Sequence, residues 1–337
     1  MPHGQSPLGG GQWLVLHVAE RGADMMPESE VTFRMVDRRH SANAGESGAR
    51  RDIPDGYRPH AVLLGYHSED QAREFLRDQA VHPDAVSDMM AERARAQSRV
   101  RTLEPFAAAS PTLPVQDPQA IAEIRRIMAQ PECRAAFPEG TWTAGMVEIA
   151  KLIPIHPSLD VRYAESLGGG SLDPAQPLSA LQLCFAAKHA SPFHFSVDHA
   201  QKSVNIAGIH PAFEVVSLRA GQQGEDGPLI VSFMVAAPPN IVVVLRYAGR
   251  LFLSGGRHRV YRLMQAGFSD VPCVVRDAPG LPQIAPYGPR FFQEPVLMAP
   301  RPPLFADFAD PELASIAPLR AMRKVIRIRP DEYLVAS

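Results

Sequence analysis

The chain has 337 residues, of which 45% are hydrophobic and 21% are charged, and its formal net charge is −2 at pH 7. This length corresponds to about two domains and leaves room for a large core. The nearly neutral balance argues against a protein that coats nucleic acid or a membrane surface, so any polyanion would be bound locally.

Proline and cysteine set further limits. Proline contributes 33 residues, about twice its usual share of roughly 5%, so many turns are expected. The three cysteines are scattered and form no Cys-x-x-Cys pair, which favours a reducing compartment and argues against structural zinc. No targeting signal and no run of ~18 apolar residues is found. We therefore expect a cytoplasmic protein without a membrane partner.

The first 145 residues are expected to form an α/β region of unassigned role. Short apolar runs predict strands at residues 13–18, 31–36 and 61–66. Ser68 followed by Gln71 is a capping box that opens a helix, and helical composition continues through residues 84–103. Asp117 and Pro118 supply the N-cap and the first-turn proline of another helix.

From residue 146 onward the chain consists of short β-branched runs separated by glycine and proline turns. Strands are predicted at residues 147–155, 193–197, 203–206, 213–218, 229–235, 241–247, 250–253 and 271–275. A helix is predicted over residues 257–266, because Val260, Leu263 and Met264 recur at helical spacing and Gly267 fits a C-terminal cap.

The tail is rich in proline over residues 279–303 and is followed by an expected helix at 311–323 and a basic strand at 324–329. The fold class is therefore α+β. Its expected parts are an N-terminal region (1–145), a mixed α/β domain (146–280) and a proline-rich extension (281–337).

The strongest chemical signal is a glycine pair between a strand and a helix. Gly255 and Gly256 allow backbone dihedrals closed to other residues, so successive amides can converge on one point at a helix N-terminus. Residues 246–262 contain five arginines, one histidine and no acid. Each cation at a helix N-terminus destabilises the helix by about 0.3–1 kcal/mol, because partial positive charge already accumulates there. A bound phosphate would offset this loss of stability. This pattern predicts an anion site, since arginine also matches phosphate oxygens with two parallel hydrogen bonds.

The same residues resemble a known superfamily. Residues 250–267, followed by Val271-Pro272-Cys273-Val274-Val275, resemble the core motif of the ParB/sulfiredoxin-like superfamily. Gly256-Arg257-His258-Arg259 stands where ParB-type partition proteins have a Gly-Glu-Arg-Arg-like motif. With Gly255 included, the segment is similar to the Gly-Gly-Cys-His-Arg motif of sulfiredoxins, and a weaker similarity covers residues 148–162. The resemblance implies a ParB/sulfiredoxin-like domain that binds a nucleotide (ATP, ADP or CTP), with Mg²⁺ as an accompanying ion.

Differences between this sequence and the family motifs argue against two of the family's activities. Arg257 replaces the sulfiredoxin cysteine whose thiolate attacks, which argues against sulfinic-acid reduction, and Cys273 lies in an apolar run typical of core. No helix-turn-helix pattern follows Arg276, which argues against chromosome partition. The expectation is nucleotide-phosphate binding, with NTP hydrolysis or phosphotransfer as its chemistry and no identified base.

Each residue of the predicted site has a role. The phosphate-binding set is Ser254, Gly255, Gly256, Arg257, His258, Arg259 and Arg262. Gly255 and Gly256 shape the backbone so that its amides converge on the phosphate. Arg257 and His258 present amides and side-chain donors, and Arg259 binds a second phosphate oxygen. Arg262 lies one turn beyond Arg259 and is equally consistent with an exposed helical arginine, while Arg246 and Arg250 are expected to face solvent.

Two pairs outside the motif are weaker candidates. Asp198 and His199 would form an acid–base pair, although the polarity of a hairpin turn explains them more simply. Asp160 and Glu165 are the nearest carboxylates to the weaker family match and would hold magnesium if phosphoryl transfer occurs, with surface acids as the default.

The remaining histidines predict no metal site. His189, His194 and His199 recur every five residues, which fits neither one helix face nor one strand face. His156 and His210 each precede a proline and are expected in turns, with a place in the pocket lining as the alternative.

Two other functions stay open. The first is a non-catalytic assembly component whose apolar strands and basic residues 320–329 contact a protein or nucleic-acid partner, although net charge does not indicate nucleic acid. The second is a ParB-like nuclease, which the lack of clustered acids near the motif disfavours.

Overall fold

The structure is a computed structural model. It describes residues 53–107, 112–167, 172–186, 194–208, 213–222, 229–236, 239–284, 288–322 and 324–331, so the strands expected at 13–18 and 31–36 lie outside the described residues. The described residues form two compact units: a core unit (within residues 53–194 and 238–323) and a strand unit (within residues 195–237 and 324–337).

The two units differ from the three consecutive segments that we expected. A strand of the N-terminal region, β1 (Tyr57–Val62), pairs with β4 (Ser158–Asp160) on one side and with β14 (Ser315–Arg320) on the other. These strands come from 1–145, 146–280 and 281–337 respectively, so the boundaries at 145 and 280 cut through one sheet.

The centre of the core unit is a five-stranded mixed sheet with the order β2-β13-β11-β12-β3. Its strands are β2 (Thr143–Glu148), β3 (Ile153–Pro154), β11 (Val243–Tyr247), β12 (Arg250–Gly255) and β13 (Asp270–Asp277). β11 and β12 form an antiparallel hairpin, β13 runs parallel to β11, and β3 runs parallel to β12. The single strand expected at 147–155 is divided by a 3-10 turn, η2 (Ile149–Lys151), between β2 and β3.

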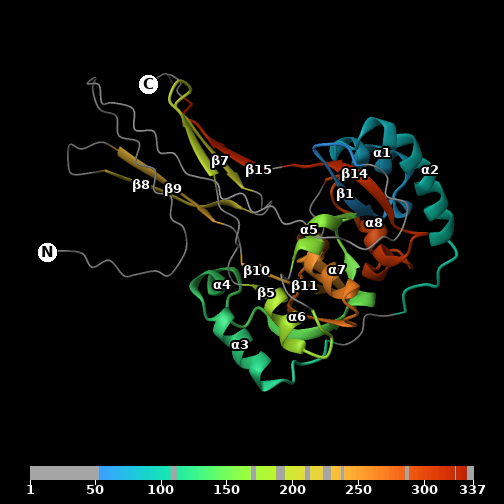
Figure 1. The fold of residues 1–337 in the computed structure, drawn as a ribbon. Helices are drawn as coiled ribbons and strands as arrows, with labels where there is room; N and C mark the ends of the chain where they lie inside the picture. Colours follow the sequence, from blue (N-terminus) through green and yellow to red (C-terminus); the bar gives the residue numbers. More distant parts are fainter. Residues whose placement is uncertain are drawn as a thin grey trace. The chain divides into compact units, whose positions relative to one another are not determined.

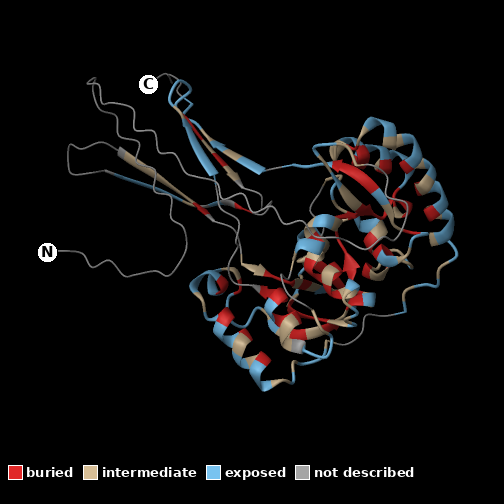
Figure 2. Ribbon diagram, in the orientation of Figure 1, coloured by how far each residue is buried: buried red, intermediate tan, exposed pale blue. Residues whose placement is uncertain are grey.

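Helices pack on this sheet and bury its apolar side chains, as the burial colours of Figure 2 show. They are α3 (Pro118–Met128), α4 (Pro131–Ala136), α5 (Val161–Ser166), α6 (Pro177–Cys184) and α7 (Arg257–Gln265). Ile124 of α3, Leu181 of α6 and Leu263 of α7 join the same buried cluster as Val244 and Val274 of the sheet. A short pair of strands, β5 (Phe185–Ala186) and β10 (Asn240–Ile241), lies at the end of α6.

The β14-β1-β4 sheet separates this large core from a smaller one. Alternation along β1 places Ala61 in the large cluster and Val62 in the small cluster, because neighbouring strand residues face opposite sides. The helices α1 (Glu69–Asp78) and α2 (Pro83–Val100) lie beside β1 and β14 (Figure 1), and the small cluster includes Phe75 of α1 and Leu319 of β14, both almost fully buried. The strand expected at 61–66 ends at Val62, and a 3-10 turn, η1 (Leu64–Tyr66), follows.

Local sequence signals are confirmed at several element ends. Ser68 and Gln71 form both hydrogen bonds of the capping box that begins α1. The Asp117 side chain caps α3, which has Pro118 in its first turn. Gly267, with φ of 87°, follows α7 as a C-terminal cap requires.

The helix expected at 311–323 is wrong, because this segment contains β14. Pro318 lacks the N–H that a helix interior needs. In the sheet it stands opposite Pro59 of β1, and its carbonyl accepts a hydrogen bond from the His82 amide (3.2 Å). A position in an antiparallel ladder therefore accommodates both prolines where a helix would not.

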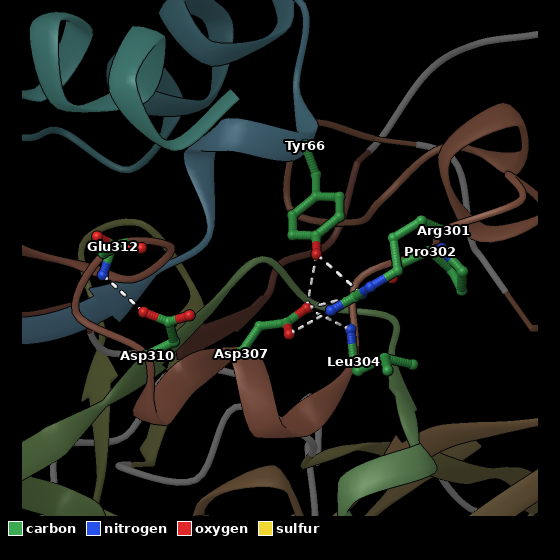
Figure 3. A network of polar contacts seen from close by, with 7 residues as sticks. All are labelled: Tyr66, Arg301, Pro302, Leu304, Asp307, Asp310 and Glu312. Atoms are coloured by element: carbon green, nitrogen blue, oxygen red, sulfur yellow. Dashed lines mark hydrogen bonds and ion pairs between the residues drawn. The ribbon is translucent and has the colours of Figure 1, made fainter. Parts of the chain in front are cut away.

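A buried polar network ties the C-terminal residues of the core unit to η1 (Figure 3). The Tyr66 hydroxyl donates to Asp307 Oδ2 (2.6 Å), and Arg301 Nη2 donates to Asp307 Oδ1 (2.7 Å). The Leu304 amide donates to Asp307 Oδ2 (2.7 Å). Because every contact compensates the buried carboxylate, the network has a structural role.

The strand unit contains the sheet β15-β7-β6 and the hairpin β8-β9. The strands are β6 (His194–Asp198), β7 (Ser203–Gly208), β8 (Glu214–Gln222), β9 (Leu229–Ala236) and β15 (Lys324–Ile328). The basic strand predicted at 324–329 is thus confirmed, and it lies at the edge of its sheet. In the part of the chain that the structure describes, no helix has the length and apolar character needed to span a bilayer.

Candidate anion-binding site

The predicted glycine pair, Gly255 and Gly256, lies where β12 meets α7, and we call this place the glycine corner. Gly256 is the N-cap of α7, with φ of 90°, and a Cβ there would lie 2.7 Å from Val242 Cγ2. The amides of Arg257 and His258 find no acceptor among the described residues, whereas the next amide, that of Arg259, donates to the Gly256 carbonyl (2.9 Å). Two N–H groups are therefore left at a helix N-terminus, where partial positive charge accumulates.

Arg257 adds an unpaired charge to these amides. Its Nε is buried, and its guanidinium makes no hydrogen bond or ion pair with any residue in the described ranges. Burial lowers the pKa of Arg257 to about 10, and the charge of Asp160 opposes this shift, so the group stays cationic at neutral pH. A buried charged donor without an acceptor is unfavourable by about 1–3 kcal/mol or more, and an anion would remove that penalty.

Two histidines meet Asp160 beside Arg257. His258 Nε2 accepts a hydrogen bond from the Asp160 amide (3.0 Å), and its ring lies edge-on to Tyr163 at 4.9 Å between centroids. His60 stands opposite Asp160 in the β1–β4 ladder, with Nε2 4.0 Å from Oδ2. The Nδ1 atom of His60 is buried and has no partner within the described chain.

A third histidine, His156, follows the end of β3. Because β3 runs parallel to β12, the residues that leave both strands emerge at the same edge of the sheet. His156 Nδ1 lies 3.2 Å from the Arg290 carbonyl, and its ring packs against Phe291 at 4.6 Å between centroids.

The three histidines are neutral at pH 7. Burial is the largest cause in each case, and it lowers the pKa of His60 to about 4 although the nearby Asp160 charge opposes the shift. The pKa values of His156 and His258 also lie well below 6.5, because the positive charge of Arg257 adds to the effect of burial.

Asp160 is the carboxylate of this corner, and its oxygens already have partners. Oδ1 caps α5 by accepting from the Tyr163 amide (2.9 Å), and Oδ2 accepts from Arg58 Nη1 (3.1 Å). The guanidinium groups of Arg257 and Arg259 act on His258, and that of Arg58 pairs with Asp160, so the described residues near His258 and Asp160 supply three guanidinium groups and one carboxylate.

Asp160 and Glu165, the magnesium candidates, are not brought together. Asp160 is buried at the start of α5, whereas Glu165 is exposed on that helix. The described part of the chain contains no group of three histidine, cysteine, aspartate or glutamate residues arranged to hold a metal ion.

Arg259 is engaged within the protein. Its Nη1 donates to the carbonyls of Asn240 (2.5 Å) and Cys184 (3.3 Å), and its Nη2 donates to the Asn240 side chain. Arg259 therefore joins α7 to β10 and to the end of α6, which is a different task from the predicted clamp on a phosphate oxygen. Arg262 lies one turn beyond His258, and its buried Nε has no partner in the described residues.

The other arginines of the acid-free segment also have partners. Arg246 pairs with Asp277 of β13 (2.6 Å), and Arg250 donates to the carbonyls of Leu297 (2.7 Å) and Ala299 (3.0 Å). Ser254 and Gly255 are partly buried at the end of β12. Among the described residues, the partners of the five arginines come from distant segments, and Arg257 and the Nε of Arg262 have none.

Asp198 and His199 belong to the strand unit, where they form the turn between β6 and β7. The Gln201 amide donates to Asp198 Oδ1 (3.0 Å), and the Lys202 amide donates to the His199 carbonyl (3.4 Å). This geometry supports the hairpin-turn explanation. His189 and His210 lie outside the described residues.

Sequence reasoning missed Arg58 and His60 and gave His156 only as an alternative. No local signal identifies them, because the pairing of β1 with β4 and of β3 with β12 brings them to the corner. Comparison of the chain with protein-family models, with curated proteins and with solved structures finds no match in any of the three.

Proposed function

We propose that the core unit binds the phosphate groups of a nucleotide at the amino end of α7. The observation that carries this proposal is the partly buried Arg257, whose buried Nε has no partner in the described chain and whose guanidinium lies next to two amides without acceptors. Donors without acceptors lower the stability of the folded protein. A ligand that supplies acceptor oxygens would remove this penalty.

The chemistry of the donors favours phosphate among anions. Two helix N-terminal amides, the Arg257 guanidinium and the neutral His258 ring offer several donors, which suits a group with many acceptor oxygens. The excess of guanidinium over carboxylate charge favours a polyanion such as a di- or triphosphate. The nucleotide part of the proposal is supported by the resemblance of residues 250–275 to the ParB/sulfiredoxin-like motif.

Thermal unfolding and calorimetric titration with ATP, ADP, CTP, GTP and inorganic triphosphate, each with and without Mg²⁺, test this proposal. A ligand at 100 times its Kd stabilises the protein by about 2.7 kcal/mol. Arg257→Met keeps the length of the side chain and removes the unpaired charge. We expect this variant to be more stable than the wild type without ligand and to bind about 10- to 100-fold more weakly, the equivalent of about 1.5–3 kcal/mol for charge-assisted hydrogen bonds.

Arg246→Met is the matched control, because Arg246 belongs to the same acid-free segment but is exposed and paired with Asp277. Its affinity should equal that of the wild type. The proposal fails if none of these compounds stabilises the protein, or if Arg257→Met binds them as tightly as Arg246→Met.

The strand unit supports a second candidate function, contact with a protein partner. Large hydrophobic side chains are exposed on its strands: Phe195 (54%), Val197 (45%), Val215 (41%), Leu218 (63%) and Val325 (54%). Large exposed apolar side chains are a feature of interaction surfaces. A photo-crosslinking residue at Leu218 should give a discrete adduct in cells, whereas one at the exposed Glu69 of the core unit should not.

A further inference from the structure

The geometry points to hydrolysis in addition to binding. We propose that Nε2 of His156 activates water for attack on the terminal phosphoryl group of a bound nucleoside triphosphate, while Arg257 and Nδ1–H of His258 donate to the phosphoryl oxygens. This inference rests on the proposed nucleotide-phosphate site and names the chemistry performed there.

The hydrogen bond of His156 fixes its tautomer. The Arg290 carbonyl can only accept, so Nδ1 of His156, 3.2 Å away, must carry the proton. Nε2 of the neutral ring then has a lone pair that no hydrogen bond within the described residues uses. A histidine held through Nδ1–H with Nε2 available is the arrangement that general-base catalysis uses, and the contact with Phe291 fixes the plane of the ring.

His258 has the opposite tautomer. The Asp160 amide can only donate, so Nε2 of His258, 3.0 Å away, must accept. The ring proton therefore lies on Nδ1, and His258 is a neutral hydrogen-bond donor. One histidine with a free lone pair and one with a free N–H are the two forms that proton abstraction and charge stabilisation require.

Strand register places both histidines at the same edge of the sheet. Phe252 and Leu253 of β12 pair with Ile153 and Pro154 of β3 in parallel register. His156 follows Pro154 by two residues, and the glycine corner directly follows β12. Burial, together with the positive charge of Arg257, lowers the pKa of both histidines, which keeps each in the neutral form that its role requires.

The proposed step is balanced with water as the co-reactant. The water oxygen forms a bond to the terminal phosphorus as the bond from that phosphorus to the bridging oxygen breaks, and the electron pair of the broken bond leaves on the bridging oxygen. The proton of the water passes to Nε2 of His156 and is then released to solvent. The products are a nucleoside diphosphate, inorganic phosphate and a proton, with charge stabilised by Arg257, His258 and the helix amides.

Phosphate release by the full-length protein from ATP, CTP and GTP, with and without Mg²⁺, tests the inference in parallel with binding. His156→Asn places an amide N–H where Nδ1–H of the histidine lies and removes the Nε2 base. We expect kcat to fall about 10²- to 10⁴-fold, the range of general-base catalysis, with nucleotide affinity nearly unchanged. His199→Asn, in the exposed turn of the strand unit, is the control and should keep full activity.

The pH profile gives a second readout. Because the pKa of His156 lies well below 6.5, kcat/KM of the wild type should not fall as the pH is lowered through 6.5. The inference is overturned if the wild type binds nucleotide without releasing phosphate, a result that leaves the proposed function standing. Equal rates for His156→Asn and the wild type also overturn it, and an absence of nucleotide binding overturns both proposals.

Discussion

Replacement of Gly256 by alanine should destabilise the core unit more than the same replacement at Gly249. Both glycines have positive φ, 90° at Gly256 and 72° at Gly249. A Cβ at Gly249 would meet no atom within 4 Å, whereas a Cβ at Gly256 would lie 2.7 Å from Val242 Cγ2 and 3.1 Å from Val242 Cα. Gly249→Ala therefore measures the backbone effect alone, and the difference between the two variants measures the steric effect.

The magnitude follows from these two effects. A non-glycine residue in the left-handed region is unfavourable by about 1–2 kcal/mol. Insertion of a methyl group into a packed site adds about 1–3 kcal/mol, and rotation of the Val242 side chain cannot relieve a contact with its Cα. We expect the free energy of unfolding to fall by about 1–2 kcal/mol for Gly249→Ala and by about 2–5 kcal/mol for Gly256→Ala.

Equilibrium unfolding in urea, followed by tryptophan fluorescence, measures both values. The chain contains two tryptophans, so a Trp13→Phe background leaves Trp142 as the reporter. Trp142 directly precedes β2 of the central sheet, and its indole donates to the Phe137 carbonyl (3.1 Å). If Gly256→Ala lowers the unfolding free energy no more than Gly249→Ala does, the corner is not confined against Val242 and the reasoning is wrong.

Two further predictions concern buried polar groups of the core unit. Tyr66→Phe removes the hydroxyl that donates to Asp307. The free energy of unfolding in urea should fall by about 1.5–3 kcal/mol, because this hydrogen bond is made to a charged group. A fall of less than about 0.5 kcal/mol would contradict the structural role of the network. His67 stacks on Phe75 and Phe292, and burial lowers its pKa to about 4. The unfolded chain then binds a proton first as the pH falls below 6.5, so His67 lowers stability progressively by up to about 3 kcal/mol between pH 6.5 and about 4. His67→Phe should lose that part of the pH dependence, and an unchanged slope would show that His67 does not titrate as described.

Elements with local causes were predictable from the sequence. The capping box at Ser68, the proline start of α3 and the glycine that ends α7 each depend on a few neighbouring residues, and the structure confirms them. The helix predicted at 311–323 was wrong, because the pairing of this segment with β1, in which Pro59 lies opposite Pro318, decides its conformation. The division into units was equally out of reach, since residues 195–237 and 324–337 leave the core unit at points that no change in composition marks.

In the candidate site too, some features depend on neighbouring residues and others depend on partners far along the chain. The glycine pair indicates a helix start with free amides, and the structure has that start at Gly256. Sequence alone does not show which arginines remain unpaired, because their partners lie far along the chain: Asp277 pairs with Arg246, and the Asn240 carbonyl accepts from Arg259. An acid-free run of arginines is therefore weak evidence for an anion site. A guanidinium whose buried Nε has no acceptor among the described residues is stronger evidence, because an unpaired, partly buried charge destabilises the free protein and can be removed by a single substitution. If Arg257→Met does not stabilise the ligand-free protein, the charge already has a partner and the main support for phosphate binding is lost.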